Sequence, residues 1–171
     1  MKPSEVIDSE YREYYGRYIR EAPDMDLKEG LSVGYISFLE FIEKIPDEKF
    51  DYRYEEGKWT IKEVLQHLID TERLFSYRAL HFAREDSSPL PGFAQDDYVS
   101  ASNANFKTSG QLISEYKALR QATISLFGSF TEKMLLSEGI LYETPMSARA
   151  AGFIIVGHEV YHRKIIEERY L

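Results

Sequence analysis

The sequence predicts an all-α protein, a four-helix bundle of up-down-down-up topology with a short N-terminal helical lead-in. Three observations support this fold class: four segments repeat apolar residues at helical spacing, capping signals precede several of them, and no segment shows a convincing strand pattern. The chain has 171 residues, of which 43% are hydrophobic and 29% charged. These values suit one globular domain spanning residues 1–171.

The lead-in is rich in tyrosine. Tyr11, Tyr14, Tyr15 and Tyr18 follow the spacing i, i+3, i+4 and i+7, which predicts a short helix with one aromatic face. This face either packs across the outside of the domain or forms the contact of a homodimer, since tyrosine is favoured at interfaces.

The first two long helices have recognisable ends. The first is expected over residues 27–45, and Pro46 ends it. The second begins after Thr60, where Glu63 completes a capping box, and continues to residue 84 or 85.

The third and fourth helices follow a long connection. The third begins near Thr108, with Gln111 completing a second capping box, and the fourth begins near Pro145 or Ser147 and almost reaches Leu171.

Residues 86–107, between the second and third helices, lack a helical period. A connection of this length is typical of parallel neighbours, so we expect the second helix to run antiparallel to the fourth. The aromatic residues Phe93 and Tyr98 in this connection would also allow it to cover a site.

Two histidines lie on the apolar face of the fourth helix. His158 and His162 are one turn apart, at i and i+4, so both rings can reach a single ion. An unpaired buried imidazole costs about 1–3 kcal/mol, which makes two of them in a core unusual. Gly157 would let this helix approach a neighbour closely.

The third histidine of the predicted site is His67. It lies one to two turns after the second helix begins, and in antiparallel helices this position is level with His162. Three neutral imidazoles suit a borderline divalent ion such as zinc or nickel and leave a coordination position open. The alternative is that the three histidines are core residues whose ring nitrogens form hydrogen bonds within the protein. His81 is assigned to the surface.

Residues 158–162 also match the H-E-x-x-H pattern of zinc proteases, with Glu159 as general base. The extended ligand pattern does not continue after His162, and no strand edge for a peptide is visible, so we expect a ligand pair and not a protease. Glu159 and Asp70 remain candidate catalytic residues, although Asp70 also fits a solvated helix face. Arg120 is the candidate substrate-binding residue; it would otherwise pair with Glu115 or a neighbouring helix.

Composition excludes several function classes. The net charge is -8 and no cluster of Lys and Arg offsets it, which argues against nucleic-acid and anionic-membrane partners. The chain has no cysteine, so any thiol chemistry must use a thiol that a substrate brings. No apolar signal core or spanning segment is present, and we therefore expect a cytoplasmic protein.

The sequence resembles the DinB/YfiT-like superfamily over nearly its whole length. The segments that carry the resemblance are GKWTIKEVLQHLIDTERLFSYRAL, LPGF and GHEVYHRKIIEERY. The superfamily's pattern of one histidine on the second helix and an H-x-x-x-H pair on the fourth matches His67, His158 and His162. The resemblance implies an up-down-down-up bundle, often dimeric, that binds nickel, zinc or a similar ion. It also implies that some relatives use a low-molecular-weight thiol, such as bacillithiol or mycothiol, as a cosubstrate.

These observations lead to three hypotheses. The first is a metal-dependent enzyme, a candidate transferase, that activates a small thiol or water for transfer to a small electrophile. The second is a non-catalytic, metal-stabilised bundle that binds a ligand or partner. The third is a metal-dependent hydrolase.

Overall fold

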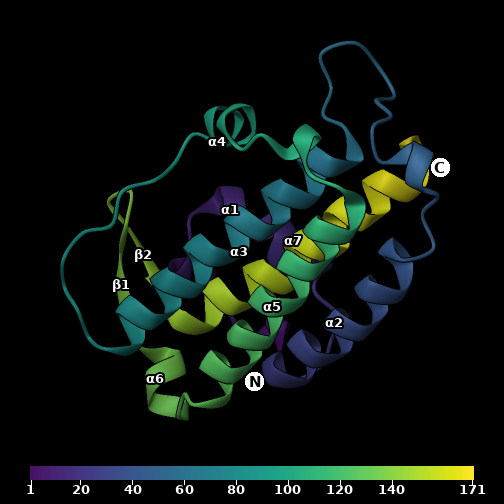
Figure 1. Ribbon diagram of the computed structural model, residues 1–171. Helices are drawn as coiled ribbons and strands as arrows, with labels where there is room; N and C mark the ends of the chain where they lie inside the picture. Colours follow the sequence, from purple (N-terminus) through teal and green to yellow (C-terminus); the bar gives the residue numbers. More distant parts are fainter.

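The computed structural model describes residues 1–171. Four long helices lie side by side in Figure 1. They are α2 (Leu27–Ile42), α3 (Ile61–Ala83), α5 (Ser109–Gly128) and α7 (Ala148–Arg169). The longest connection, residues 84–108, joins the parallel helices α3 and α5, whereas α3 and α7 are antiparallel and form the most extensive helix contact. The predicted fold class and topology are confirmed.

The helix starts follow the capping signals. Thr60 and Thr108 each accept a hydrogen bond from the backbone N–H of the residue three positions on, and both capping boxes are complete. α7 begins after Ser147, whose hydroxyl accepts from the backbone N–H of Ala150. The helix ends are less well predicted, since α2 stops at Ile42 and not at residue 45.

The bundle has two apolar cores, one at each end. The core at the end where α2 and α7 begin includes Leu31, Phe75, Phe127 and Ile154. The core at the opposite end, where α3 and α5 begin, includes Phe38, Leu65, Leu112 and Ile166. Between them lies a layer of buried polar side chains, which are His67, Thr71 and Glu72 on α3, Arg120 on α5, and His158, Glu159 and His162 on α7. A buried polar group without a partner costs about 1–3 kcal/mol, so the partners of this layer decide its role.

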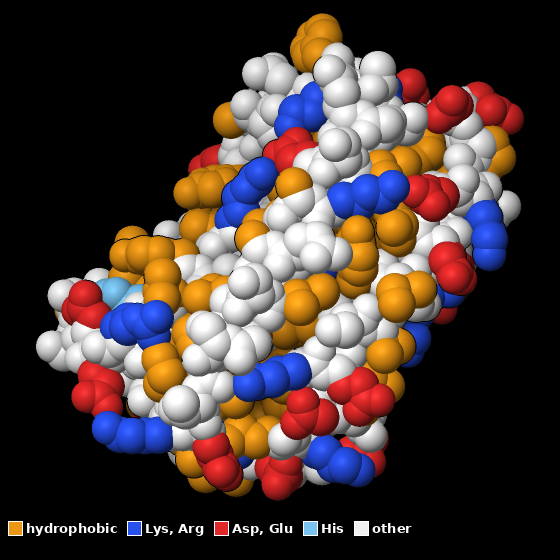
Figure 2. Space-filling view, turned by 60° about the horizontal axis from the view of Figure 1, so that its bottom comes forward, with side chains coloured by type: hydrophobic (Ala, Val, Ile, Leu, Met, Phe, Trp, Pro, Cys, Tyr) orange, Lys and Arg blue, Asp and Glu red, His pale blue; other side chains and the backbone are white.

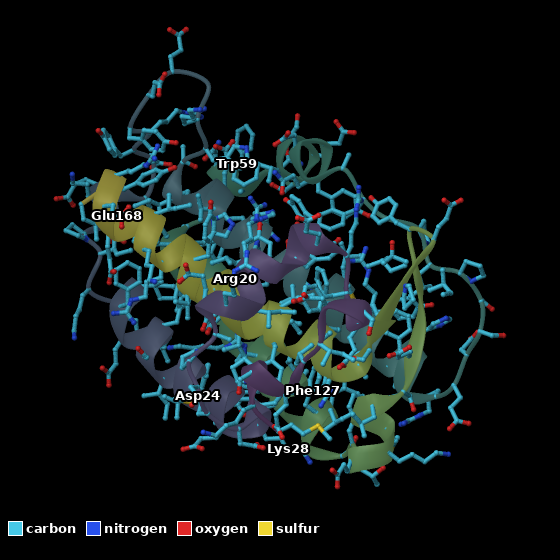
Figure 3. All side chains as sticks on the ribbon, turned by 180° about the vertical axis from the view of Figure 1, so that it is seen from behind. Arg20, Asp24, Lys28, Trp59, Phe127 and Glu168 are labelled. Carbon is cyan, nitrogen blue, oxygen red and sulfur yellow. The ribbon has the colours of Figure 1, made fainter.

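The lead-in helix α1 (Glu13–Glu21) lies across α7, as Figure 3 shows from behind. The contact depends on Gly157, because a Cβ atom there would lie 1.7 Å from the backbone oxygen of Tyr18. The predicted close approach is therefore confirmed, and the neighbour is α1. Tyr15 and Tyr18 are buried within the chain and Tyr14 is 48% exposed, which favours the packing interpretation of the tyrosine face.

The connections contain regular structure that the sequence analysis missed. Residues 138–147 form an antiparallel hairpin of β1 (Glu138–Leu141) and β2 (Thr144–Ser147), so the expectation of no strand pairing is wrong. Its turn residues Tyr142 and Glu143 have φ values of 50° and 62°, as a type I′ turn requires, but lack the Asn and Gly that usually signal this turn.

Short helices also occupy these connections. Residues 86–107 include α4 (Gln95–Ala101), so the expected structureless crossover is wrong in this part, and α6 (Glu132–Leu136) precedes the hairpin. Four short 3-10 helices are also present, namely η1 (Pro3–Glu5), η2 (Asp8–Glu10), η3 (Asp47–Lys49) and η4 (Ala104–Phe106), of which η4 also lies within residues 86–107. In Figure 1, α4 lies above the bundle.

His81 is not on the surface as expected. It is 7% exposed, and its Nε2 atom lies 2.9 Å from the backbone oxygen of Ser88. The chain after α3 folds back over the helix end and covers this ring, which sequence spacing alone does not reveal.

The surface is mixed in charge. On the face in Figure 2, acidic and basic side chains are interspersed and no continuous basic area is visible. None of the helices combines the length and the apolar character needed to cross a membrane.

Candidate metal centre

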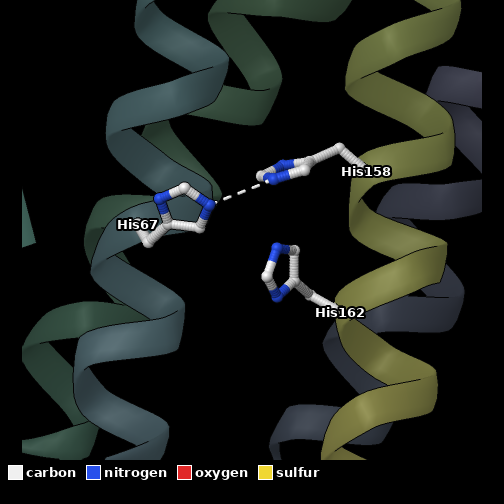
Figure 4. A group of neighbouring side chains, drawn as sticks. All are labelled: His67, His158 and His162. Atoms are coloured by element: carbon white, nitrogen blue, oxygen red, sulfur yellow. Dashed lines mark hydrogen bonds between the residues drawn. The ribbon is translucent and has the colours of Figure 1, made fainter. Parts of the chain in front are cut away.

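Three histidines meet in the space between α3 and α7. Figure 4 shows His67 on α3 facing His158 and His162 on α7. The Nε2 atoms of His67 and His158 are 3.1 Å apart, and one ring nitrogen of each histidine lies within 4.8 Å of the other two. Two nitrogens that share a tetrahedral zinc ion, each about 2.0–2.1 Å from it, lie about 3.3 Å apart. The cluster therefore has the chemistry and the spacing to hold a divalent ion.

Burial keeps all three rings neutral. It lowers the pKa of His67 to about 4. It lowers the pKa of His162 to about 3, with a smaller contribution from the charges of His67 and Arg17, and it holds the pKa of His158 well below its usual value. A neutral imidazole offers a nitrogen lone pair, so each ring can act as a ligand at pH 7.

Neighbouring side chains fix the orientation of the rings. The Trp59 ring packs against His67 with centroids 4.9 Å apart, and the Tyr18 ring meets His158 edge-on at 4.8 Å. The hydroxyl oxygen of Thr71 lies 3.5 Å from Nδ1 of His67, and Tyr161 packs edge-on against His162. The sequence analysis did not assign Trp59 or Tyr18 to the site. The sequence offered one indirect signal for each: Trp59 lies next to the N-cap of α3, and Tyr18 belongs to the tyrosine face.

A cavity of about 330 Å³ opens onto the cluster, and we call it the aromatic cavity. His67, His158 and Thr71 line it on the histidine side. The rest of the lining consists of Arg12, Gln95, Ile154 and six aromatic residues, namely Tyr14, Tyr15, Tyr18, Phe75, Phe93 and Tyr142. No Asp or Glu lines this cavity. A volume of this size falls within the range of small-molecule sites.

A second cavity, of about 300 Å³, lies on the side of His162. Trp59 borders it, and it differs from the aromatic cavity in containing both a cation and an anion, Lys58 and Asp96. The histidine cluster is therefore reached from two sides.

Arg120 and Glu159 belong to a separate buried cluster. The Arg120 guanidinium donates to both carboxylate oxygens of Glu72 at 2.8 Å and to Glu159 at 2.7 Å and 3.3 Å. The Tyr116 hydroxyl donates to Glu159 at 2.7 Å. Arg120 thus pairs with the neighbouring helices α3 and α7, whereas Glu115 pairs with Lys107 and Arg73.

This arrangement bears on the roles suggested for Arg120 and Glu159. Arg120 is 1% exposed and its donors are engaged by carboxylates, so the geometry gives no support to substrate binding. Burial raises the pKa of Glu159, which the positive charge of Arg120 partly offsets. The Glu159 carboxylate bonds to Arg120 and Tyr116 and not to any histidine.

Asp70 is likewise held away from the histidines. Its carboxylate, 22% exposed, accepts hydrogen bonds from Gln66 at 3.0 Å and Arg73 at 3.1 Å. These contacts favour the alternative that Asp70 belongs to a solvated helix face. They give no support to the suggested catalytic role of Asp70.

Comparisons with known proteins agree with this site. A family model described as the DinB superfamily matches residues 35–166. A protein of Oceanobacillus iheyensis named "putative metal-dependent hydrolase" is 28% identical over 97 residues, which are 56% of this chain and 55% of that protein. The match thus spans about half the length of this curated relative.

Two solved structures share the fold. YfiT from Bacillus subtilis, described as "a probable metal-dependent hydrolase with an unusual four-helix bundle topology", aligns with a TM-score of 0.71 at 17% identity, over 96% of this chain and 90% of that one. A mycothiol-dependent maleylpyruvate isomerase aligns with a TM-score of 0.65 at 12% identity, over 82% of this chain and 60% of that one. At these identities the likeness concerns the fold alone. The family model covers most of the chain, including all three histidines, and the protein therefore belongs to the DinB superfamily.

Proposed function

We propose that this protein is a metal-dependent enzyme that activates a low-molecular-weight thiol for transfer to a small electrophile. The observation that carries the proposal is the histidine cluster itself, three neutral imidazoles of which two, His67 and His158, line a cavity without any acidic side chain. Three protein ligands leave a coordination position for a reactant, whereas structural zinc sites usually have four.

Each part of the site has a role in this proposal. His67, His158 and His162 would hold a zinc or nickel ion. Such an ion, when bound, lowers the pKa of a thiol or water and so favours the anionic nucleophile. Thr71 and Trp59 hold the His67 ring in place, and the aromatic cavity offers the reactants a largely aromatic surface beside the histidines.

The nucleophile must come from solution. The chain has no cysteine, and the carboxylates of Asp70 and Glu159 bond to other groups away from the histidines. A thiol brought by a cosubstrate fits this requirement. The mycothiol dependence of the structurally similar isomerase supports it, although the fold is all that the two chains are known to share.

A metal-dependent hydrolase that uses water is the second candidate. It is favoured by the names of two relatives, the Oceanobacillus protein and YfiT. The two candidates differ in one requirement, because only the transferase consumes a thiol.

The test combines metal analysis with a thiol assay. Protein purified without an affinity tag is expected to contain about one divalent ion per chain, and His158→Ala is expected to lose it. His81→Ala is the matched control, because His81 is also buried but lies at the far end of α3. The metal-loaded protein is then incubated with small electrophiles and several thiols, and free thiol is measured over time.

The outcomes separate the hypotheses. Metal-dependent loss of free thiol in the wild type and in His81→Ala, but not in His158→Ala, supports the transferase. Turnover of esters or amides without any thiol would favour the hydrolase. An equal metal content in all three proteins would contradict the metal site.

A further inference from the structure

Arg78 is the one buried cation of the chain without a carboxylate partner. It is 2% exposed, and its Nη1 atom is the only buried side-chain nitrogen or oxygen that has no hydrogen-bond partner. Its Nη2 atom makes a single long bond, 3.4 Å, to the backbone oxygen of Pro91. A guanidinium carries five N–H donors, so most of its capacity is unused. Burial lowers the pKa of Arg78, as expected when no counter-ion compensates for lost water.

The guanidinium of Arg78 lies against the aromatic cavity. Its Cζ atom is 4.7 Å from the ring centre of Phe75 and 5.7 Å from that of Phe93. The hydroxyl groups of Tyr15 and Tyr142 lie close enough to influence the pKa of Arg78, which they raise. All four of these residues line the aromatic cavity, so the guanidinium lies directly behind that part of its wall.

The surroundings of the aromatic cavity favour an anion. Arg12 lines the cavity, and Arg17 lies over the rings of Tyr14 and Tyr18, which also line it. Neither of these arginines, nor Arg78, forms an ion pair with a carboxylate, and no acidic residue lines the cavity. This is unusual for a protein with a net charge of -8.

We infer that the aromatic cavity binds a reactant that carries a carboxylate, and that Arg78 is the residue that recognises it. The inference rests on the proposed function and adds the substrate class to it. A carboxylate in the cavity supplies the counter-charge that the buried guanidinium lacks, and the attraction between the two charges is stronger in this low-dielectric interior than in water. The carboxylate belongs either to the thiol or to the electrophile.

The positions of Arg78 and His67 set the length of such a reactant. The two residues are separated by eleven positions on α3, which is about 16 Å along the helix axis. Helical side chains tilt toward the helix N-terminus, and the Arg78 side chain is longer than that of His67, so the guanidinium lies nearer to the histidines than this axial distance. A chain-like molecule shorter than that distance can have its anionic group beside Arg78 and its reacting atom at the cluster.

The test uses two probes of equal length that differ in charge, 8-mercaptooctanoate and 8-mercaptooctanol. Cobalt(II)-substituted protein reports thiolate binding through its sulfur-to-cobalt absorption band, without any turnover. In the wild type, half-saturation with the carboxylate is expected at a concentration at least about tenfold lower than with the alcohol. Arg78→Met is expected to reduce this ratio to about one, and Arg78→Lys to retain part of it.

Arg84→Met is the matched control. Arg84 directly follows α3 and, like Arg78, lies over an aromatic ring, that of Phe130, but it is exposed and does not line the cavity. This variant should keep the wild-type ratio. If Arg78 only holds the chain near Pro91 in place, its replacement can change the affinity for both probes. It should not change the ratio between the half-saturation concentrations of the alcohol and the carboxylate.

A second arm locates the carboxylate. With 2-mercaptoethanol as the thiol, 8-bromooctanoate and 8-bromooctanol are compared as electrophiles. A charge preference that Arg78→Met abolishes in this arm alone assigns the carboxylate to the electrophile and still supports the inference. A preference that persists in Arg78→Met, as it would if the carboxylate bound the ion, overturns it.

Octanoate gives a readout that does not depend on thiol chemistry. It is expected to raise the Tm of the wild type more than that of Arg78→Met, whereas 1-octanol should not distinguish them. Absence of the cobalt–thiolate band for every thiol would contradict the proposed function, and the octanoate titration would then still decide the role of Arg78.

Discussion

His158 and Glu159 are neighbours on α7, but their side chains enter two buried clusters that balance their charges differently. Glu159 joins Arg120, Glu72 and Tyr116, where each charged group bonds to a partner of the same chain. His158 joins His67 and His162, where three neutral rings face one another without a carboxylate or cation between them.

The difference indicates which cluster has a ligand. The Arg120 cluster is complete within the chain, because each of its charged groups has an oppositely charged partner and hydrogen bonds that offset part of the cost of removing it from water. In the histidine cluster, His162 forms no hydrogen bond within the protein, and an added ion would engage all three rings. We expect the first cluster to stabilise the fold and the second to bind a ligand, and three predictions test this contrast.

The largest effect is expected for Arg120→Met. It leaves Glu72 and Glu159 buried without a counter-charge, and losing one partner of a buried ion pair typically costs about 3–5 kcal/mol. Urea unfolding measures the loss. Replacing Arg120, Glu72 and Glu159 together with uncharged residues should recover most of it. Unchanged stability with weakened substrate affinity would instead mean that Arg120 contacts the substrate.

Metal addition should give an intermediate effect that depends on the histidine cluster. An ion at about 100 times its Kd stabilises the folded state by about 2.7 kcal/mol, which raises the Tm by several degrees. His162→Ala should abolish most of this rise, whereas Glu72→Gln should leave it intact because Glu72 belongs to the other cluster. Differential scanning calorimetry with and without zinc or nickel provides the measurement, and an equal rise in all three proteins would contradict the contrast.

Gly157→Ala should have the smallest effect on stability, and it should affect the histidine cluster and not the Arg120 cluster. The added methyl group meets the backbone of Tyr18 and forces α1 away from α7, and overpacking of this kind costs about 1–3 kcal/mol. Because Tyr18 packs on His158, metal affinity should fall with stability. Both quantities are measured by urea unfolding and by competition with a chelator. Gly128→Ala is the control, since a Cβ atom there meets nothing within 4 Å.

The parts of the structure that local rules govern were predictable. Capping boxes at Thr60 and Thr108 located two helix starts, because they depend on residues only three positions apart. The i, i+4 spacing of His158 and His162 placed both on one helix face, and the length of the connection after α3 indicated that His67 would lie level with them.

The parts of the structure that depend on contacts between distant residues were not predictable from the sequence. The hairpin turn at Tyr142 adopts positive φ without glycine or asparagine, so no residue type announced it. His81 was misplaced because the chain that covers it arrives from beyond the helix end. The position of Arg78 beside the cavity was not predicted, because the Phe93 ring that packs against it comes from the connection after α3.

The sequence by itself determined the helices, their antiparallel pairing and the three histidines that converge between them. It did so because periodicity, capping and ligand spacing act over a few residues, and connection length constrains which helices are neighbours. Only the tertiary structure decided that Glu159 and Arg120 form an ion pair and that Tyr18 of α1 packs against His158. It also decided that the cavity beside the histidine cluster is lined by aromatic residues and by no acidic residue. These features join residues far apart in the chain, and their partners are chosen by packing and by the cost of leaving a buried charge unpaired.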